Sequence, residues 1–452
     1  MSELRTIARH AGTVLIGQLA VMSFGVADTL IAGRYSPHAL AILSLASSIY
    51  ISIYVALNGM LQALLPVWAE LHGAGRTAEI GRSFRQALYI CAGATAVGFC
   101  GLWFPDPWLS LTDVPAELWP DIRAYLQILA VALVPSQLFR MYGTLNQSLG
   151  YPRLVTWLQA GALLVKVPLS YGLTFGAAGL PGLGIVGCAW ATLIVNTLMM
   201  LTGLWMLRTQ DIYTPYRLWR RLEKPNGSTL RHFLQLGVPA GLSIMVEVTS
   251  FTLMALFIAR LGAVASASHQ IAASMASVLY MVPLALGIAS SARTGYWLGA
   301  NQPGKARHAA GLGMGMAVAA ALLCAGLLFL GRESLAQVFT NTPEVAQAAS
   351  LWLVWVALYH LADAVQAVCA FLLRCYRITL APLLIYTTLL WGAGLYGGYQ
   401  LAYSGLAWAS LDARPSVDSF WMTSTAALVV VSALFVWLVW RAARAPHTLS
   451  SH

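Results

Sequence analysis

Three acidic side chains lie in stretches that are otherwise apolar. They are Asp28 in "FGVADTLIAG", Glu247 in "IMVEVTSFTL" and Asp363 in "WVALYHLADAVQAVCAFLL". An ionised carboxylate at the centre of a bilayer costs about 3 kcal/mol even by low estimates, so it must be protonated, paired, bound to a cation or in contact with water. A carboxylate placed in this way binds protons, sodium ions and organic cations in competition. That competition is the minimal chemistry of an antiporter.

The spacing of polar residues around two of these acids suggests how each could be supported. Tyr359 and Asp363 are four residues apart and share one helix face, so a phenol and a carboxylate could meet the same ligand. Gln366 follows three residues later and could donate a hydrogen bond to that carboxylate. Thr249 and Ser250 follow Glu247, and their hydroxyls could satisfy its lone pairs.

Two basic residues also lie within apolar stretches. Arg140 is about two turns from the predicted cytoplasmic end of its helix, and its long side chain can extend to the membrane surface. Lys166, in "GALLVKVPLSYGL", is near the predicted middle of the membrane. Such a lysine needs a specific partner or a water-filled crevice.

The composition indicates the kind of protein that must position these residues. The chain has 452 residues, of which 59% are hydrophobic and only 9% charged, compared with about 25% charged in ordinary soluble domains. About twelve apolar stretches are long enough to span a bilayer, and runs such as "AVAAALLCAGLLFL" lack the alternation of a β-barrel. We therefore expect an all-α polytopic membrane protein with twelve transmembrane helices and no cleavable signal peptide.

The six cysteines show no metal-ligand spacing and are expected to be reduced packing residues. No cofactor is expected. The net charge of +10 could suggest a nucleic-acid partner, but most of the 26 Lys and Arg residues fall in alternate loops, which is the positive-inside pattern. We expect a multi-pass protein of a bacterial-type inner (plasma) membrane, with both termini cytoplasmic, contact with membrane lipids and no nucleic-acid partner.

The two halves of the chain resemble each other. "LHGAGRTAEIGRSFRQAL" parallels "WLGANQPGKARHAAGLG", and the pairs Gly73 with Gly299 and Tyr151 with Tyr376 are separated by about half the chain. We therefore divide the chain into a six-helix bundle (1–207), a cytoplasmic linker (208–232), a second six-helix bundle (233–445) and a polar tail (446–452). Six spans per half make the repeat parallel, with a pseudo-two-fold axis along the membrane normal, which is a transporter plan.

Several longer segments resemble one known family. They include "GVADTLIAGRYSPHALAILSLASSIY", "LPVWAELHGAGR", "GVPAGLSIMVEVTSFTLMALFIARLG" and "LYHLADAVQAVCAFLLRCYR", and they occur in the order found in that family. The chain resembles the multidrug and toxic compound extrusion (MATE) transporters, and within them the NorM-type branch.

This resemblance implies a monomeric efflux transporter that exports organic, often cationic compounds in exchange for sodium ions or protons. It implies a sodium or proton site at Glu247, Tyr359 and Asp363, and a proton-coupling role for Asp28. Gln366, Thr249, Ser250 and Phe251 are candidates for the substrate cavity, although packing alone would also account for Phe251.

The chain departs from the family at Lys166 and Ser170, where many relatives have asparagines. A fixed ammonium near Asp28 would disfavour sodium there and keep that carboxylate ionised. Our hypothesis is a Lys166–Asp28 pair that opens when a proton arrives. The alternative is that Lys166 faces another partner or a water-filled crevice.

Three other functions compete with efflux for a polytopic helical protein. A lipid-linked precursor flippase of related fold would need a cationic cavity for a pyrophosphate, whereas the intramembrane residues here include an excess of acids. An enzyme is not expected, because His269, the nearest candidate base, has no nucleophile or metal-ligand set beside it. A channel is only weakly disfavoured.

Overall fold

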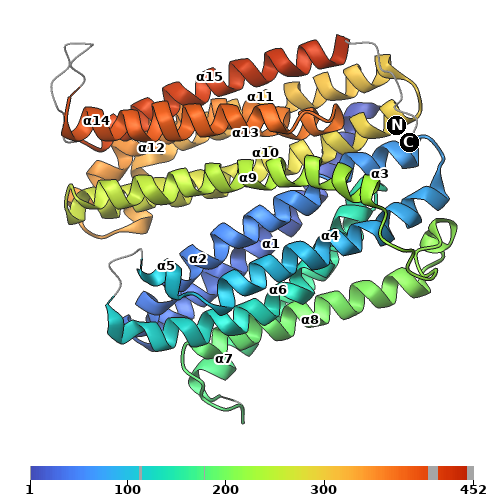
Figure 1. Ribbon diagram of the computed structural model, residues 1–452. Coiled ribbons are helices and arrows are strands. Elements are labelled where there is room, and N and C mark those ends of the chain that lie inside the picture. The colour runs from blue at the N-terminus through green and yellow to red at the C-terminus, as the bar shows by residue number, and fades with distance from the viewer. Residues whose placement is uncertain (1, 111–114, 178, 406–415, 445–452) are drawn as a thin grey trace. The chain divides into compact units, whose positions relative to one another are not determined.

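The computed structural model describes residues 2–110, 115–177, 179–405 and 416–444, and the predicted polar tail lies outside this part of the chain. The described residues form helices joined by short loops, with no strand among them. Twelve helical segments are long and apolar enough to cross a membrane, as the sequence predicts (Figure 1). The protein is therefore a multi-pass, all-α membrane protein.

The chain divides into two compact units, which are described separately. The N-terminal unit runs from Ile16 to Gly241, and the C-terminal unit combines the residues up to Leu15 with those from Leu242 onward. The helices of the N-terminal unit are α1 (Glu3–Tyr35), α2 (Pro37–Gln62), α3 (Leu65–Gly73), α4 (Thr77–Trp103), α5 (Asp106–Ser110), η1 (Ala116–Leu118), α6 (Trp119–Ser148), α7 (Pro152–Phe175), α8 (Val186–Thr209) and η2 (Asp211–Tyr216). Those of the C-terminal unit are α9 (Gly227–Ala259), α10 (Ala263–Gly299), α11 (Pro303–Phe339), α12 (Pro343–Cys375), α13 (Leu380–Tyr386), the π-helix η3 (Thr387–Tyr396), α14 (Gly397–Tyr403) and α15 (Val417–Arg444).

These boundaries differ from the expected ones for physical reasons. The first turns of α1 belong to the C-terminal unit because Glu3 receives hydrogen bonds from Arg293 at 2.6 and 2.9 Å and Ile7 packs in that unit's core. The first turns of α9 belong to the N-terminal unit, where Phe233 is buried. α1 and α9 are thus continuous helices that pass from one unit into the other.

The expected linker packs against α4. Arg85 donates to Glu223 at 2.7 Å and to the Arg217 carbonyl at 2.8 Å, and Gln86 donates to the Lys224 carbonyl at 3.0 Å. Residues 208–226 are therefore held to the N-terminal unit through a set of specific polar contacts.

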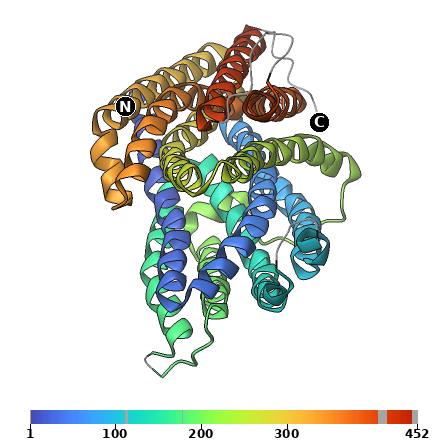
Figure 2. The ribbon, with the colours of Figure 1, turned by 90° about the vertical axis from the view of Figure 1, so that its left-hand side faces the viewer.

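One helix forms the centre of each bundle. In the N-terminal unit α6 packs against α2, α4 and α8, and in the C-terminal unit α12 packs against α10, α11 and α15. Figure 2 shows the helices of the C-terminal unit (yellow to red) packed side by side as a bundle. Because other helices pack around it, each central helix buries polar side chains such as Asn146 of α6 and Gln366 of α12.

Candidate functional site

The N-terminal unit contains a buried ion pair between α1 and α7. Lys166 Nζ lies 2.8 Å from Oδ1 and 2.9 Å from Oδ2 of Asp28, and it also donates to Ser170 Oγ at 2.9 Å and to the Cys188 carbonyl at 3.1 Å. Ser170 Oγ in turn donates to Asp28 Oδ1 at 3.0 Å. The ammonium has three donors, and each has an acceptor. This is the pair that the hypothesis named, although whether a proton opens it is a separate question.

Local backbone features place Lys166 at this position. Gly187 of α8 lies so close to α7 that an added Cβ would be 2.6 Å from the Leu173 carbonyl carbon, and small residues of this kind allow membrane helices to approach. The approach brings the Cys188 carbonyl within reach of the ammonium. Pro168 lies inside α7 and has no N–H for the helical ladder, so one backbone hydrogen bond is missing while the helix continues from Lys166 to Ser170.

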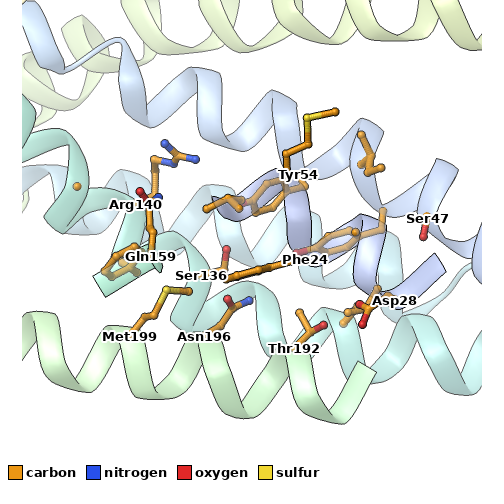
Figure 3. Close-up of a pocket in the computed structure, with 18 of the residues that line it drawn as sticks. Phe24, Asp28, Ser47, Tyr54, Ser136, Arg140, Gln159, Thr192, Asn196 and Met199 are labelled. Atoms are coloured by element: carbon orange, nitrogen blue, oxygen red, sulfur yellow. The ribbon is translucent and has the colours of Figure 1, made fainter. Parts of the chain in front are cut away.

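A cavity of about 320 Å³ opens beside this ion pair. Its lining includes Asp28, several aromatic rings and polar side chains of α6 and α8 (Figure 3). Tyr50 and Tyr54 stack with their ring centroids 5.3 Å apart. The cavity could therefore hold a flat aromatic molecule against tyrosine rings.

Arg140 lies at the other end of this cavity from Asp28, as Figure 3 shows. Its Nε donates to Asn58 Oδ1 at 3.2 Å. The expectation that Arg140 extends to the membrane surface was wrong, because the side chain lines the cavity and bonds to α2.

The C-terminal unit contains two buried carboxylates on different helices. Gln366 Nε2 donates to Glu247 Oε1 at 2.9 Å and to Asp363 Oδ1 at 2.9 Å. One amide group of α12 therefore joins the acid of α9 to the acid of α12, and all three side chains are buried. The donation from Gln366 to Asp363 was predicted, whereas the spacing alone did not predict the bridge to Glu247.

Tyr386 of α13 fixes the orientation of this amide. Its hydroxyl donates to Gln366 Oε1. With the carbonyl oxygen engaged in this way, the Nε2 hydrogens of Gln366 face the two carboxylates, which accept hydrogen bonds when ionised. Tyr386 is a site residue that the sequence did not single out.

Charged and polar groups of neighbouring helices also act on the pair. Arg374, buried at the end of α12, interacts electrostatically with Glu247, and its guanidinium lies 4.4 Å from the centroid of the Phe371 ring. Tyr280 of α10 interacts electrostatically with both acids. The negative charge of the pair is therefore partly compensated by one buried cation of α12.

The other predicted residues have different contacts. The hydroxyls of Thr249 and Ser250 donate to backbone carbonyls of their own helix at 2.6 and 2.7 Å, so the prediction that they satisfy Glu247 was wrong. Tyr359 packs against Phe251 and Trp421, with ring centroids 5.5 and 5.8 Å away. Phe251 thus has the packing role that was weighed for it, and the described residues include no hydrogen bond from Tyr359 to Asp363.

Comparison with known proteins identifies the family. The MatE family model matches residues 14–172 and again 239–399. The chain belongs to the MatE family. The two matches to this family model start 225 residues apart and end 227 apart, which supports the internal repeat expected from the sequence.

Relatives of this MatE protein cover nearly its whole length. The chain is 38% identical over 442 residues to the probable multidrug resistance protein NorM of Aromatoleum aromaticum, covering 98% of this chain and 95% of that protein. It is 34% identical over 401 residues to the multidrug resistance protein PmpM of Pseudomonas aeruginosa, covering 88% and 84%.

Solved structures show the same MatE fold. The eukaryotic MATE transporter AtDTX14 matches with a TM-score of 0.86 at 18% identity, covering 98% of this chain and 97% of that one. The Vibrio cholerae MATE transporter VcmN in the bent form matches with a TM-score of 0.81 at 19% identity, covering 98% and 97%. The two-bundle architecture with twelve spans is therefore that of the MATE transporters.

Proposed function

We propose that this MatE protein is an efflux transporter that exports organic compounds in exchange for protons. The names of its relatives, which include NorM and PmpM, refer to multidrug resistance. The observation that carries the proposal is the pair of buried carboxylates, Glu247 and Asp363, held by one amide group. Two ionised carboxylates this deep in a membrane repel each other and are poorly solvated, so the pair takes up a cation readily.

The geometry of Gln366 favours the proton over sodium at this pair. The Nε2 hydrogens point at both carboxylates, where a sodium ion shared by the two acids would have to bind. A sodium ion needs oxygen ligands at that position and not N–H groups. Sodium could enter only after the amide turned its Oε1 toward the acids, which would break the hydrogen bond from Tyr386. A proton can bind to either carboxylate without this rearrangement.

The N-terminal pair supplies a second proton site in this proposal. A proton that reaches Asp28 removes its negative charge, and Lys166 then keeps Ser170 and the Cys188 carbonyl as acceptors but loses its ionic partner. The local charge rises by one, which repels a cationic group of a ligand held at the Asp28 end of the adjacent cavity. Since the ammonium already occupies the position of a metal ion, sodium has no place at Asp28.

These events fit an alternating-access cycle in a bacterial inner membrane, with both chain termini in the cytoplasm. Protons entering from outside displace the exported compound, and their release on the cytoplasmic side allows the next compound to bind. No enzymatic step, cofactor or nucleic-acid partner enters this cycle, and a monomer is sufficient for it.

The test is efflux of ethidium from liposomes that contain the purified protein. A pH gradient and a sodium gradient are imposed separately on the wild type and on the Asp363→Asn variant. We expect the pH gradient to drive efflux by the wild type and not by the variant. Efflux driven by the sodium gradient would show that sodium and not the proton is the coupling ion. If a folded protein gave no efflux under either gradient, the transporter proposal would be refuted.

A further inference from the structure

The cavity of the N-terminal unit contains a cationic side chain that has no acidic partner among the residues the structure describes. Asp28 is the acidic residue among those lining the cavity, and Lys166 already neutralises it. Arg140, at the opposite end, bonds to the neutral Asn58, and it forms no ion pair with the described residues. The cavity therefore carries an excess of about one positive charge, located at Arg140.

The surroundings of Arg140 are suited to a ligand. A guanidinium has five N–H donors in a planar fork that matches a carboxylate. Arg140 bonds to Asn58 Oδ1 through Nε and to the Tyr54 hydroxyl, which leaves terminal N–H donors for a ligand. Tyr54, which interacts with both Asn58 and Arg140, stacks on Tyr50 to form an aromatic wall. A flat ring that lies along this wall would place a substituent next to the guanidinium.

The internal repeat gives independent support. The two halves are offset by 225 to 227 residues, and Arg140 is separated by 226 residues from Gln366. Both residues are on the central helix of their unit, α6 and α12. Gln366 is the residue that donates to two carboxylates in the C-terminal unit, whereas the N-terminal unit has a guanidinium at this position, which bonds to no carboxylate in the described part of the chain.

We infer that Arg140 forms a carboxylate-binding subsite, through which the N-terminal cavity takes aromatic compounds that carry a carboxylate. This inference rests on the proposed efflux function and names a substrate class for it. Purely cationic compounds gain nothing from Arg140, since the guanidinium repels them. Aromatic acids and zwitterions gain a charge-assisted hydrogen bond.

A matched pair of fluorescent probes tests this subsite. Rhodamine 110 carries a free carboxylate, and rhodamine 123 is its methyl ester with the same ring system. Binding of each dye to the purified full-length protein is measured by fluorescence anisotropy. We expect Arg140→Gln to weaken the binding of rhodamine 110 about tenfold or more while rhodamine 123 binds as well as before or more tightly.

Two further variants serve as controls. Arg140→Lys keeps the charge and loses the fork, so it should retain part of the preference for rhodamine 110. Arg153→Gln removes a positive charge from an exposed position at the start of α7 and should leave the binding of both dyes unchanged. Equal changes for the two dyes in Arg140→Gln, or no change for either, would overturn the subsite.

A measurement on the wild type keeps the test independent of variant folding. Benzoate should displace rhodamine 110 and benzamide, its neutral analogue, should not, whereas equal displacement by both would overturn the inference. Failure of the efflux proposal gives a different result, namely that the wild type moves neither dye across liposomes under any gradient, whatever its binding preference.

Discussion

At the scale of single residues, each buried ionisable group in the two sites has identifiable partners. Lys166 has three hydrogen-bond donors, and they are shared among Asp28, Ser170 and the Cys188 carbonyl. Gln366 uses both sides of its amide, donating to two acids and accepting from Tyr386. Because a low-dielectric environment penalises unpaired polar groups, removing one partner should lower the free energy of unfolding more than removing both partners.

The Lys166–Asp28 pair provides a direct test of this asymmetry. We expect Lys166→Met to lower the free energy of unfolding by about 3–5 kcal/mol, because it leaves Asp28 as a buried, unpaired charge. The double variant Asp28→Asn with Lys166→Met should recover most of that loss. Denaturant unfolding in detergent micelles measures both values, and a double variant no more stable than the single one would contradict this account.

The hydroxyl of Tyr386 offers a test of ion selectivity. Tyr386→Phe removes the donor to Gln366 Oε1, so the amide can turn this oxygen toward Glu247 and Asp363 and complete a set of oxygen ligands. We expect the affinity of the pair for sodium to rise about tenfold, since one such hydrogen bond is worth about 1–2 kcal/mol, so that a sodium gradient drives efflux by this variant although it does not drive efflux by the wild type.

Ethidium efflux under a sodium gradient measures this change. The matched control is Tyr359→Phe, because Tyr359 packs against Phe251 and Trp421 and has no described bond to Gln366. Equal sodium responses in the two variants would show that Tyr386 does not govern the amide.

At the scale of helices, close approach between α7 and α8 positions the N-terminal site. It depends on Gly187, where a Cβ would lie 2.6 Å from the backbone of Leu173. Gly161 on α7 is the opposite case, because it is exposed and a Cβ there would meet nothing within 4 Å. Two glycines on adjacent helices therefore have opposite structural roles.

Alanine substitutions should separate these two roles. Gly187→Ala forces α7 and α8 apart and should lower the free energy of unfolding by about 1–3 kcal/mol. Gly161→Ala should raise it by up to about 1 kcal/mol, because alanine is the better helix former. Thermal unfolding of the two variants in the same detergent shows whether each substitution stabilises or destabilises the protein. Destabilisation by both would show that the space around each glycine does not determine the effect of the added methyl group.

At the scale of the whole molecule, hydropathy sufficed to predict twelve spans, and the similarity of segments half a chain apart sufficed to predict an internal repeat, since both signals are distributed along the chain. Contacts between distant helices could not be predicted in the same way. The spacing of Asp363 and Gln366 on one helix predicted their contact, but the bridge to Glu247 and the hydroxyl of Tyr386 depend on how α9, α12 and α13 pack. Arg140 was misjudged because distance from a helix end does not reveal which face a side chain occupies.

The two units hold different charges, and this asymmetry has a consequence for coupling. The N-terminal site is a neutral pair of Asp28 and Lys166, whereas the C-terminal site has two acids joined by Gln366. If each unit binds its own proton during the cycle, the double variant Asp28→Asn with Lys166→Met should exchange one proton fewer per exported molecule. This variant removes the N-terminal ion pair without leaving an unpaired charge.

The substrate gradient at zero net flux measures this stoichiometry. For each pH unit imposed across the liposome membrane, we expect the double variant to sustain a gradient about tenfold smaller than the wild type does, because one proton contributes about 1.4 kcal/mol per pH unit. A parallel measurement on Glu247→Gln should also give a reduced gradient, since it removes one acid of the other site. An unchanged gradient in the double variant would mean that Asp28 and Lys166 stabilise the unit without carrying a coupled proton, and that coupling belongs to the C-terminal carboxylates alone.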